Sequence, residues 1–425
     1  LSLPMTTYAR RVGLFPASML VVGGIIGSGI FLNPSVVAAR AGSSTLIISA
    51  WVLGGVIAIL GAFIFAELGA RRPATGGGYI YLREAWGPLP AFLYAWTILL
   101  VIGSGAIAAV AMTFASYALA VIGLPAAWTN ALALLAIVAL TGLNVLGVRQ
   151  SAVTTTIFTL LKLGALAMLI VVGLGGELAG RFPDALPQQP PTTPVIALAG
   201  ALVPVLFAYG GWQQTNFMAE ELIDPERNLP RALLLGVLIV VAVYVSANLV
   251  YVGALGPAGL AASTAPAADT MQIVLGPIGR TLIGAGIALS TFGFLNLAIC
   301  ANARVIQAMA ADGLFFEPFA RLHPRFQTPH IALIAQGAWS AALALTRSYG
   351  ALLDYVVFGD WIFFGLTAAT LFVYRRRDQG KAPPPFRAPF WAVSTGLFVL
   401  AAIYVVLGSI SAAPGNALRG AALIG

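Results

Sequence analysis

Two glycine-rich interruptions of long apolar runs contain the residues best suited to chemistry in this sequence. The first has four glycines between Gly23 and Gly29, followed by Pro34. The second has Pro204 ahead of Phe207-Ala208-Tyr209-Gly210-Gly211-Trp212. Because each interior glycine destabilises a helix by roughly 1 kcal/mol relative to alanine, both helices are expected to unwind at these points. Unwound backbone exposes N–H groups that can bind a carboxylate and carbonyl oxygens that can bind an ammonium, so the two segments together could hold a zwitterion.

The composition indicates an all-α integral membrane protein. Of the 425 residues, 60% are hydrophobic and only 8% are charged, which is more apolar surface than one soluble core can bury. A helix needs about 20 apolar residues to cross roughly 30 Å of hydrocarbon. Eleven complete spans are predicted at 13–39, 44–68, 88–121, 127–147, 152–174, 195–220, 230–254, 277–309, 331–346, 351–373 and 389–411. The apolar residues after Asn416 are expected to begin a twelfth span.

The two interruptions occupy matching places if spans one to five and six to ten form two structural repeats. Each interruption then falls in the first helix of a repeat. Paired interruptions at corresponding positions of two halves indicate the binding site of a secondary transporter. The alternative is purely structural: Gly23 and Gly27 would form a helix-packing face, and Gly210 with Gly211 would form a simple kink.

The formal charge of +8 is better explained by topology than by a nucleic-acid partner. If residue 1 is cytoplasmic, sixteen of the 22 Lys and Arg residues fall on the cytoplasmic side, five fall on the other side and Lys162 lies within a span. This asymmetry predicts a cytoplasmic N-terminus. The single cysteine, Cys300, cannot form an intramolecular disulfide and is expected to be a buried thiol.

Two ionisable residues are predicted inside the membrane. Lys162 lies about 10 residues, and so roughly 15 Å, from either end of the fifth span, which is too far for its side chain to reach the surface. An ionisable residue at such a depth is a candidate functional residue. Asp360, about nine residues into the tenth span, either faces a substrate pathway or approaches the outer surface. Glu67 is expected to be a solvated carboxylate at the end of its helix.

Neither a metal, a cofactor nor an enzymatic activity is expected. His323 and His330 share one predicted loop, but no Cys or carboxylate lies at metal-ligand spacing from them. Gly76-Gly77-Gly78 has no following Gly-Lys-Ser/Thr, so it is interpreted as a flexible turn rather than a phosphate loop. Asp360 resembles half of an aspartyl protease site, but no second mid-membrane aspartate accompanies it.

Several segments resemble the amino acid–polyamine–organocation (APC) superfamily, specifically a bacterial member of its L-type amino acid transporter (LAT) branch. They are Ile25-Ile26-Gly27-Ser28-Gly29-Ile30-Phe31, Phe207-Ala208-Tyr209-Gly210-Gly211-Trp212 followed by Glu220-Glu221, Gly87-Pro88-Leu89-Pro90-Ala91-Phe92, and Arg304 to Gly313. The resemblance implies one transmembrane domain over 1–425 with a LeuT-like 5+5 inverted repeat and discontinuous helices 1 and 6. The first repeat would be 13–174, the second 195–373, and helix 11 with the start of helix 12 would occupy 389–425.

The resemblance also implies roles for individual residues. Carbonyls that bind the substrate ammonium fall on Ile25, Phe207 and Gly210, and groups that bind its carboxylate fall on Gly27, Ser28 and Gly29. Positions near the substrate side chain are Ile102, Ala106, Phe358 and Trp361. Lys162 falls where sodium-coupled relatives place a cation, so it is expected to donate to carbonyls near Gly24 in place of sodium. It would be either a permanently charged strut in an exchanger or a proton carrier in a symporter.

The expected function is sodium-independent exchange of neutral L-amino acids by alternating access in the cell inner (plasma) membrane. A proton-coupled symporter and a non-transporting sensor of the same fold are the alternatives. The expected partners are the amino acid itself and membrane lipid. Animal members of the family pair with a glycoprotein through a cysteine between the third and fourth spans. Around Leu124-Pro125 this sequence has no cysteine, so a disulfide-linked subunit is not expected.

Overall fold

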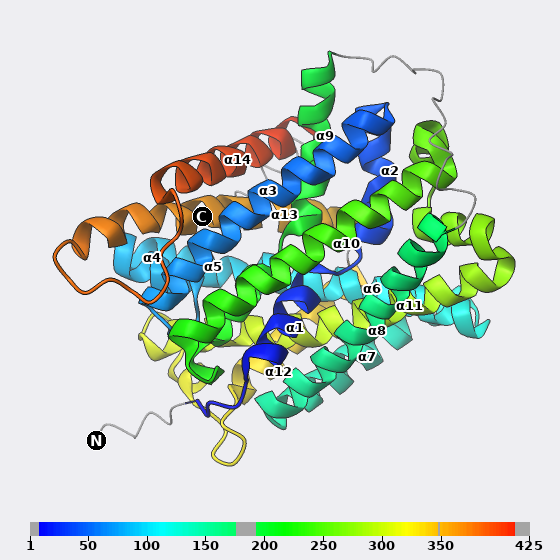
Figure 1. Ribbon diagram of the computed structural model, residues 1–425. Coiled ribbons are helices and arrows are strands. Elements are labelled where there is room, and N and C mark those ends of the chain that lie inside the picture. Colours follow the sequence, from blue (N-terminus) through cyan, green and yellow to red (C-terminus); the bar gives the residue numbers. More distant parts are fainter. Residues whose placement is uncertain (1–7, 176–192, 347–348, 413–425) are drawn as a thin grey trace.

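A computed structural model describes residues 8–175, 193–346 and 349–412, which form a bundle of helices (Figure 1). The helices are α1 (Leu14–Ile25), α2 (Gly29–Ala41), α3 (Ser44–Arg71), α4 (Gly78–Trp86), α5 (Pro88–Thr97), α6 (Gly103–Ile122), α7 (Thr129–Val145), α8 (Val148–Gly175), α9 (Pro194–Tyr209), α10 (Pro225–Ala262), α11 (Pro266–Ala311), α12 (His330–Thr346), α13 (Tyr349–Arg377) and α14 (Trp391–Ala412). The predicted all-α membrane fold is confirmed.

The described helices follow the predicted apolar runs in order. Eight of them are long and apolar enough to span a membrane, and α1 with α2 adds a ninth span that bends by 40°. The third span is continuous over Pro88–Ile122, because the π-helical segment η1 (Ile98–Ile102) joins α5 to α6. The helices α12 and α13 cover the two remaining predicted spans. The predicted start of a twelfth span, after Asn416, lies outside the described residues.

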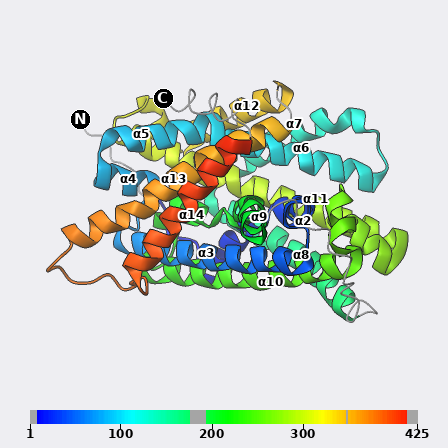
Figure 2. The same ribbon diagram turned by 90° about the horizontal axis from the view of Figure 1, so that it is seen from above.

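The broken helices lie at the centre of the bundle. Figure 2 shows α9 almost end-on in the middle, with α2 beside it and α3 and α10 along one side. Much of the outer surface is apolar: Val138, Val171 and Leu400 are each more than half exposed. Lipid covers such side chains without loss, because hydrocarbon tails are as apolar as the side chains themselves. The polar groups of the spans therefore gather inside, around the breaks.

One expectation about an end of the bundle is wrong. Glu67 was expected to be solvated, but it is fully buried, and its carboxylate lies 2.8 Å from Arg71 and 2.6 Å from Arg375. The turn that was expected to be flexible has a tertiary contact, because the Gly76 N–H donates to the Phe217 carbonyl at 2.9 Å. Arg375 and Phe217 lie far along the chain, and local sequence carries no signal for such contacts.

Candidate functional site

The first break separates α1 from α2. The helix α1 ends at Ile25, and Ile26 has a ψ of 88°, which is not helical. The N–H of Gly27 then donates to the Ile25 carbonyl at 2.9 Å, and Ser28 is the N-cap of α2. The first N–H groups of a helix have no partner within the helix. The N-terminus of α2 at Gly29 therefore places backbone donors in the interior of the bundle, as the glycine pattern predicts.

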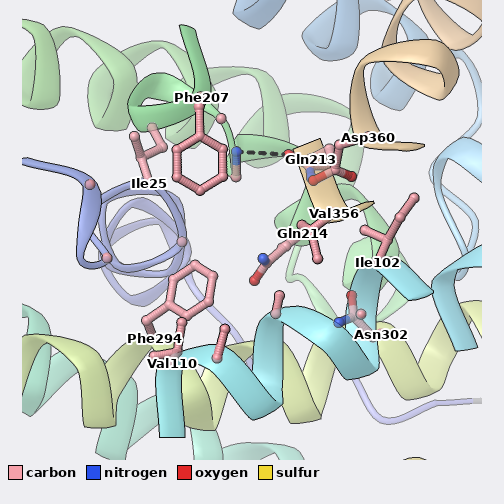
Figure 3. A pocket seen from close by; sticks show the side chains of 18 of the residues that line it. Ile25, Ile102, Val110, Phe207, Gln213, Gln214, Phe294, Asn302, Val356 and Asp360 are labelled. Atoms are coloured by element: carbon pink, nitrogen blue, oxygen red, sulfur yellow. Dashed lines mark hydrogen bonds between the residues drawn. The ribbon is translucent and has the colours of Figure 1, made fainter. Parts of the chain in front are cut away.

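The second break follows α9. The helix ends at Tyr209, and the chain resumes at Trp212 as the 3₁₀ helix η4 (Trp212–Glu221). Gly211 has a φ of 119°, in the region that residues with a Cβ rarely adopt. Its N–H donates to the side-chain oxygen of Gln213 at 3.0 Å, which Figure 3 draws as a dashed line. Both segments are thus interrupted rather than continuous helix.

The two breaks touch each other through backbone atoms. A Cβ added to Gly211 would lie 2.1 Å from the Gly24 carbonyl oxygen, and one added to Gly24 would lie 2.8 Å from the Gly211 oxygen. Any side chain at Gly211 would overlap the first break. The glycines therefore do more than weaken two helices: they let the unwound backbones meet directly.

Lys162 holds the first break from α8. Its ammonium donates to the carbonyls of Ile26 at 2.6 Å and Gly23 at 3.3 Å, and the side chain is fully buried. Ser290 of α11 places its hydroxyl 3.3 Å from the carbonyls of Ile26 and Gly27. The expected neighbour was Gly24, so the observed acceptors lie directly before it and two residues after it. Lys162 does not line the central cavity.

Tyr244 of α10 connects the two breaks and was not anticipated. Its hydroxyl lies 3.1 Å from the Ile25 carbonyl and 3.3 Å from the Ala208 carbonyl. The Gly27 N–H already donates to the Ile25 carbonyl, and the single hydroxyl proton of Tyr244 can donate to Ile25 or to Ala208. A ligand ammonium that binds Ile25 would therefore share this carbonyl with Gly27 and compete with Tyr244 for it. A tyrosine within an apolar helix gives no sequence signal for such a contact.

A cavity lies against both breaks, with about 900 Å³ of empty space including the part that is open to solvent. Nine of the ten residues predicted to contact a substrate line it: Ile25, Gly27, Ser28, Gly29, Ile102, Ala106, Phe207, Gly210 and Trp361. Phe358 does not line it, although Val356, two residues before it, and Asp360, two residues after it, both do. Asp360 does line the cavity. Of the two predicted alternatives, the substrate pathway and the outer surface, its position therefore agrees with the first.

The cavity has two chemically different sides (Figure 3). Phe207 and Phe294 present their rings near the first break, on the side of Ile25. The opposite side is mixed: it carries Asp360 and Asn302 beside the apolar Ile102 and Val356, with Gln214 reaching towards the middle. Gln214, Asn302 and Phe294 were not anticipated, because neither apolar periodicity nor glycine content marks the polar lining of a cavity.

A buried ion pair lies beside the start of α1. Arg304 of α11 lies 2.6 Å from the carboxylate of Glu221, and both side chains are at most 1% exposed. The backbone N–H groups of Arg11 and Val12, just before α1, donate to the Glu221 carbonyl oxygen at 2.9 and 3.0 Å. From the sequence, Arg304 was counted with the cations of the cytoplasmic side, and the structure buries it completely in this ion pair. Its pair joins α11 and η4 to the start of α1.

A helical bundle of membrane spans, in which two broken helices flank an internal cavity, defines the protein as a membrane transporter. Residues 12–418 match the family described as Amino acid permease, and the chain belongs to that family. The membership predicted from the sequence motifs is thereby confirmed. Among the described residues, no three His, Cys, Asp or Glu side chains gather as a metal site would require.

Three mouse proteins illustrate the similarity. The chain is 36% identical over 376 residues to "Large neutral amino acids transporter small subunit 2" of Mus musculus, covering 86% of this chain and 70% of the relative. It is 34% identical over 383 residues to "Asc-type amino acid transporter 1", covering 88% and 72%. It is 32% identical over 419 residues to "b(0,+)-type amino acid transporter 1", covering 97% and 85%. All three relatives are named as amino acid transporters.

Proposed function

We propose that this protein exchanges neutral L-amino acids across the plasma membrane by alternating access, without sodium. The observation that carries the proposal is the direct contact of two unwound backbones beside a cavity. Backbone N–H groups at the start of α2 are suited to the substrate carboxylate, and carbonyls of Phe207 and Gly210 at the end of α9 are suited to its ammonium. The relatives' names support an amino acid as the cargo.

Lys162 supports the absence of sodium coupling. Its ammonium already donates to the carbonyls of Gly23 and Ile26, next to the Ser290 hydroxyl. Sodium would need these same oxygen ligands, and an ammonium at 2.6 Å leaves it no room. In this proposal the lysine ammonium occupies the place that a coupling cation would need, which supports exchange over sodium-coupled symport.

The remaining assignments belong to the same proposal. The two repeats would be 13–174 and 195–373, the N-terminus would be cytoplasmic, and no subunit would be joined by a disulfide. The last point rests on Cys300, which is the single cysteine of the sequence and is buried.

The test is uptake of radiolabelled serine, alanine and leucine into proteoliposomes. Uptake is expected only when the vesicles contain an internal amino acid, and it should not change when choline replaces sodium. Net uptake into empty vesicles that accelerates on external acidification would establish proton symport instead. Binding without flux would establish a sensor.

The site is tested by Gly29→Leu. A side chain at this position meets Ala208 of the second broken helix, since even a Cβ would lie 3.1 Å from that residue. Exchange should be lost while the purified variant stays folded. The matched control is Gly164→Leu, because Gly164 lies on an exposed face of α8 with nothing within 4 Å of an added Cβ. Normal exchange by Gly29→Leu would exclude the proposed site.

A further inference from the structure

Asp360 is the one acidic residue on the wall of the cavity, and no Lys, Arg or His is among the lining residues. The residue lies in α13 and is partly buried, on the opposite side of the cavity from Ile25 of the first break. None of the described side chains or backbone groups forms a hydrogen bond or ion pair with its carboxylate. Lys162, which lies within a span, donates to backbone carbonyls and does not line the cavity.

The fully buried carboxylates of Glu67 and Glu221, unlike that of Asp360, are paired with arginines. Glu67 has two arginines within 2.8 Å, and Glu221 has Arg304 at 2.6 Å. Removing a carboxylate from water is costly unless a cation or several donors replace the lost hydration. Within the described residues, Asp360 has neither, so its carboxylate is available to a group that enters the cavity, such as a cation on the cargo or a proton.

A second acceptor lies on the same wall. The side-chain oxygen of Gln214 is buried and has no hydrogen-bond donor among the described residues. Figure 3 shows Gln214 reaching into the middle of the cavity, with Asp360 beyond it. The Asp360 carboxylate, together with the amide groups of Gln214 and Asn302 on the same wall, forms a polar surface that is complementary to a cation bearing several N–H groups. A wall built for purely apolar side chains would not leave a carboxylate and an amide oxygen unsatisfied.

The arrangement places these acceptors where the cargo's side chain would lie. The α-amino and α-carboxyl groups of a cargo have their partners at the two breaks, near Ile25 and Phe207. Asp360 and Asn302 lie on the opposite side of the cavity from Ile25. A side chain that extends away from the breaks therefore points towards the side of the cavity that carries Asp360 and Asn302.

We infer that Asp360 is a specificity-determining residue that admits amino acids whose side chain ends in an ammonium, in addition to neutral ones. The inference rests on the proposed function for the placement of the cargo's α-groups. It adds a substrate class, the short cationic amino acids, represented by ornithine. Norleucine is the matched neutral probe, because a methyl group replaces the side-chain ammonium at the same chain length.

The experiment compares ornithine with norleucine in the wild type, Asp360→Asn and the control Asp269→Asn. Asp269 is an acidic residue outside the cavity that pairs with Arg280 at 3.6 Å. Both labelled compounds are exchanged against internal alanine in proteoliposomes. Binding is measured separately, as the rise in melting temperature of purified protein with each compound. Asp360→Asn should lower the ornithine-to-norleucine ratio at least about tenfold in both measurements, because a charge-assisted hydrogen bond is lost. Asp269→Asn should leave the ratio unchanged.

Three outcomes would overturn the inference. The first is a wild type that binds norleucine but not ornithine. The second is an Asp360→Asn variant that loses both compounds equally, which would place the carboxylate at the α-ammonium. The third is acid-stimulated net uptake of norleucine that requires Asp360. This result would make a proton, rather than the side chain of the cargo, the partner of Asp360. A protein that shows no exchange, but whose ornithine-to-norleucine binding ratio still depends on Asp360, would reject the proposed transport. The same result would support the inference about Asp360.

Discussion

The two breaks are held open by different means. The carbonyls of the first break accept hydrogen bonds from side chains of three other helices: Lys162 of α8, Tyr244 of α10 and Ser290 of α11. The second break is shaped mainly by its own residues, the backbone of Gly211 and the side chain of Gln213, although the Tyr244 hydroxyl also lies 3.3 Å from the Ala208 carbonyl. The first break therefore depends on tertiary partners, and the second depends on a glycine conformation. Variants should separate the two, with backbone substitutions acting most strongly at the second break and side-chain deletions acting at the first.

The largest effect is expected from Gly211→Ala. Its new Cβ would lie 2.1 Å from the Gly24 oxygen, and its φ of 119° would be strained for any residue with a side chain. Exchange should fall by about a hundredfold or more, since strain and overlap add. Uptake in proteoliposomes and the melting temperature are the measurements. Gly164→Ala is the control, because an added Cβ there meets nothing within 4 Å. Exchange within threefold of wild type would show that the breaks need not touch.

Lys162→Ala should have the next largest effect. It leaves the carbonyls of Gly23 and Ile26 without their ammonium donor inside the bundle. Each unsatisfied carbonyl costs about 1–3 kcal/mol, so a shift of about thirtyfold between arrangements of the first break is expected. Exchange rates measured from each side of the membrane would report it. The comparison variant is Arg280→Ala, whose exposed ion pair contributes little. Equal rates for both variants would remove the proposed role of Lys162.

Tyr244→Phe tests the link between the breaks with a single atom. Loss of the hydroxyl removes the hydrogen bond to the carbonyl of Ile25 or Ala208, worth about 1 kcal/mol, and exchange should fall about fivefold. Tyr251→Phe is a matched control on the same helix, because the Tyr251 hydroxyl is buried and has no hydrogen-bond partner among the described residues. If the two variants behave alike, Tyr244 acts through packing and not through its hydroxyl.

The smallest effect is expected from Ser290→Ala. Its hydroxyl lies 3.3 Å from two carbonyls, which is long for a strong bond, and Lys162 remains at one of them. The loss should be about 0.5 kcal/mol, or roughly twofold in exchange. Ser340→Ala is the control, since buried Ser340 donates only within its own helix, to Gln336 at 2.8 Å. A loss as large as that of Lys162→Ala would mean that the hydroxyl, rather than the ammonium, holds the first break.

Sequence reasoning located the cavity well and its polar contacts poorly. Glycine and proline act on the backbone of their own segment, so Gly27, Gly29 and Gly210 could be assigned to the breaks without any structure. Phe358 does not line the cavity although residues two positions either side of it do, because a resemblance fixes a helix only to within a residue or so and neighbouring residues of one helix point about 100° apart. Tyr244 and Gln214 could not be predicted, since nothing in their local sequence shows which atoms they face.

The sequence by itself determined that the chain is a helical membrane protein, where its spans lie and at which two points they break. Those features follow from apolar length and from glycine, which act locally along the chain. Only the tertiary structure decided that the breaks touch at Gly24 and Gly211, that Lys162 binds the carbonyls on either side of Gly24, and that Asp360 faces the cavity while Glu67 and Arg304 are buried in ion pairs. The reason is physical: a buried charge is stabilised by whichever helix happens to lie opposite, and that partner is separated from it by scores or hundreds of residues.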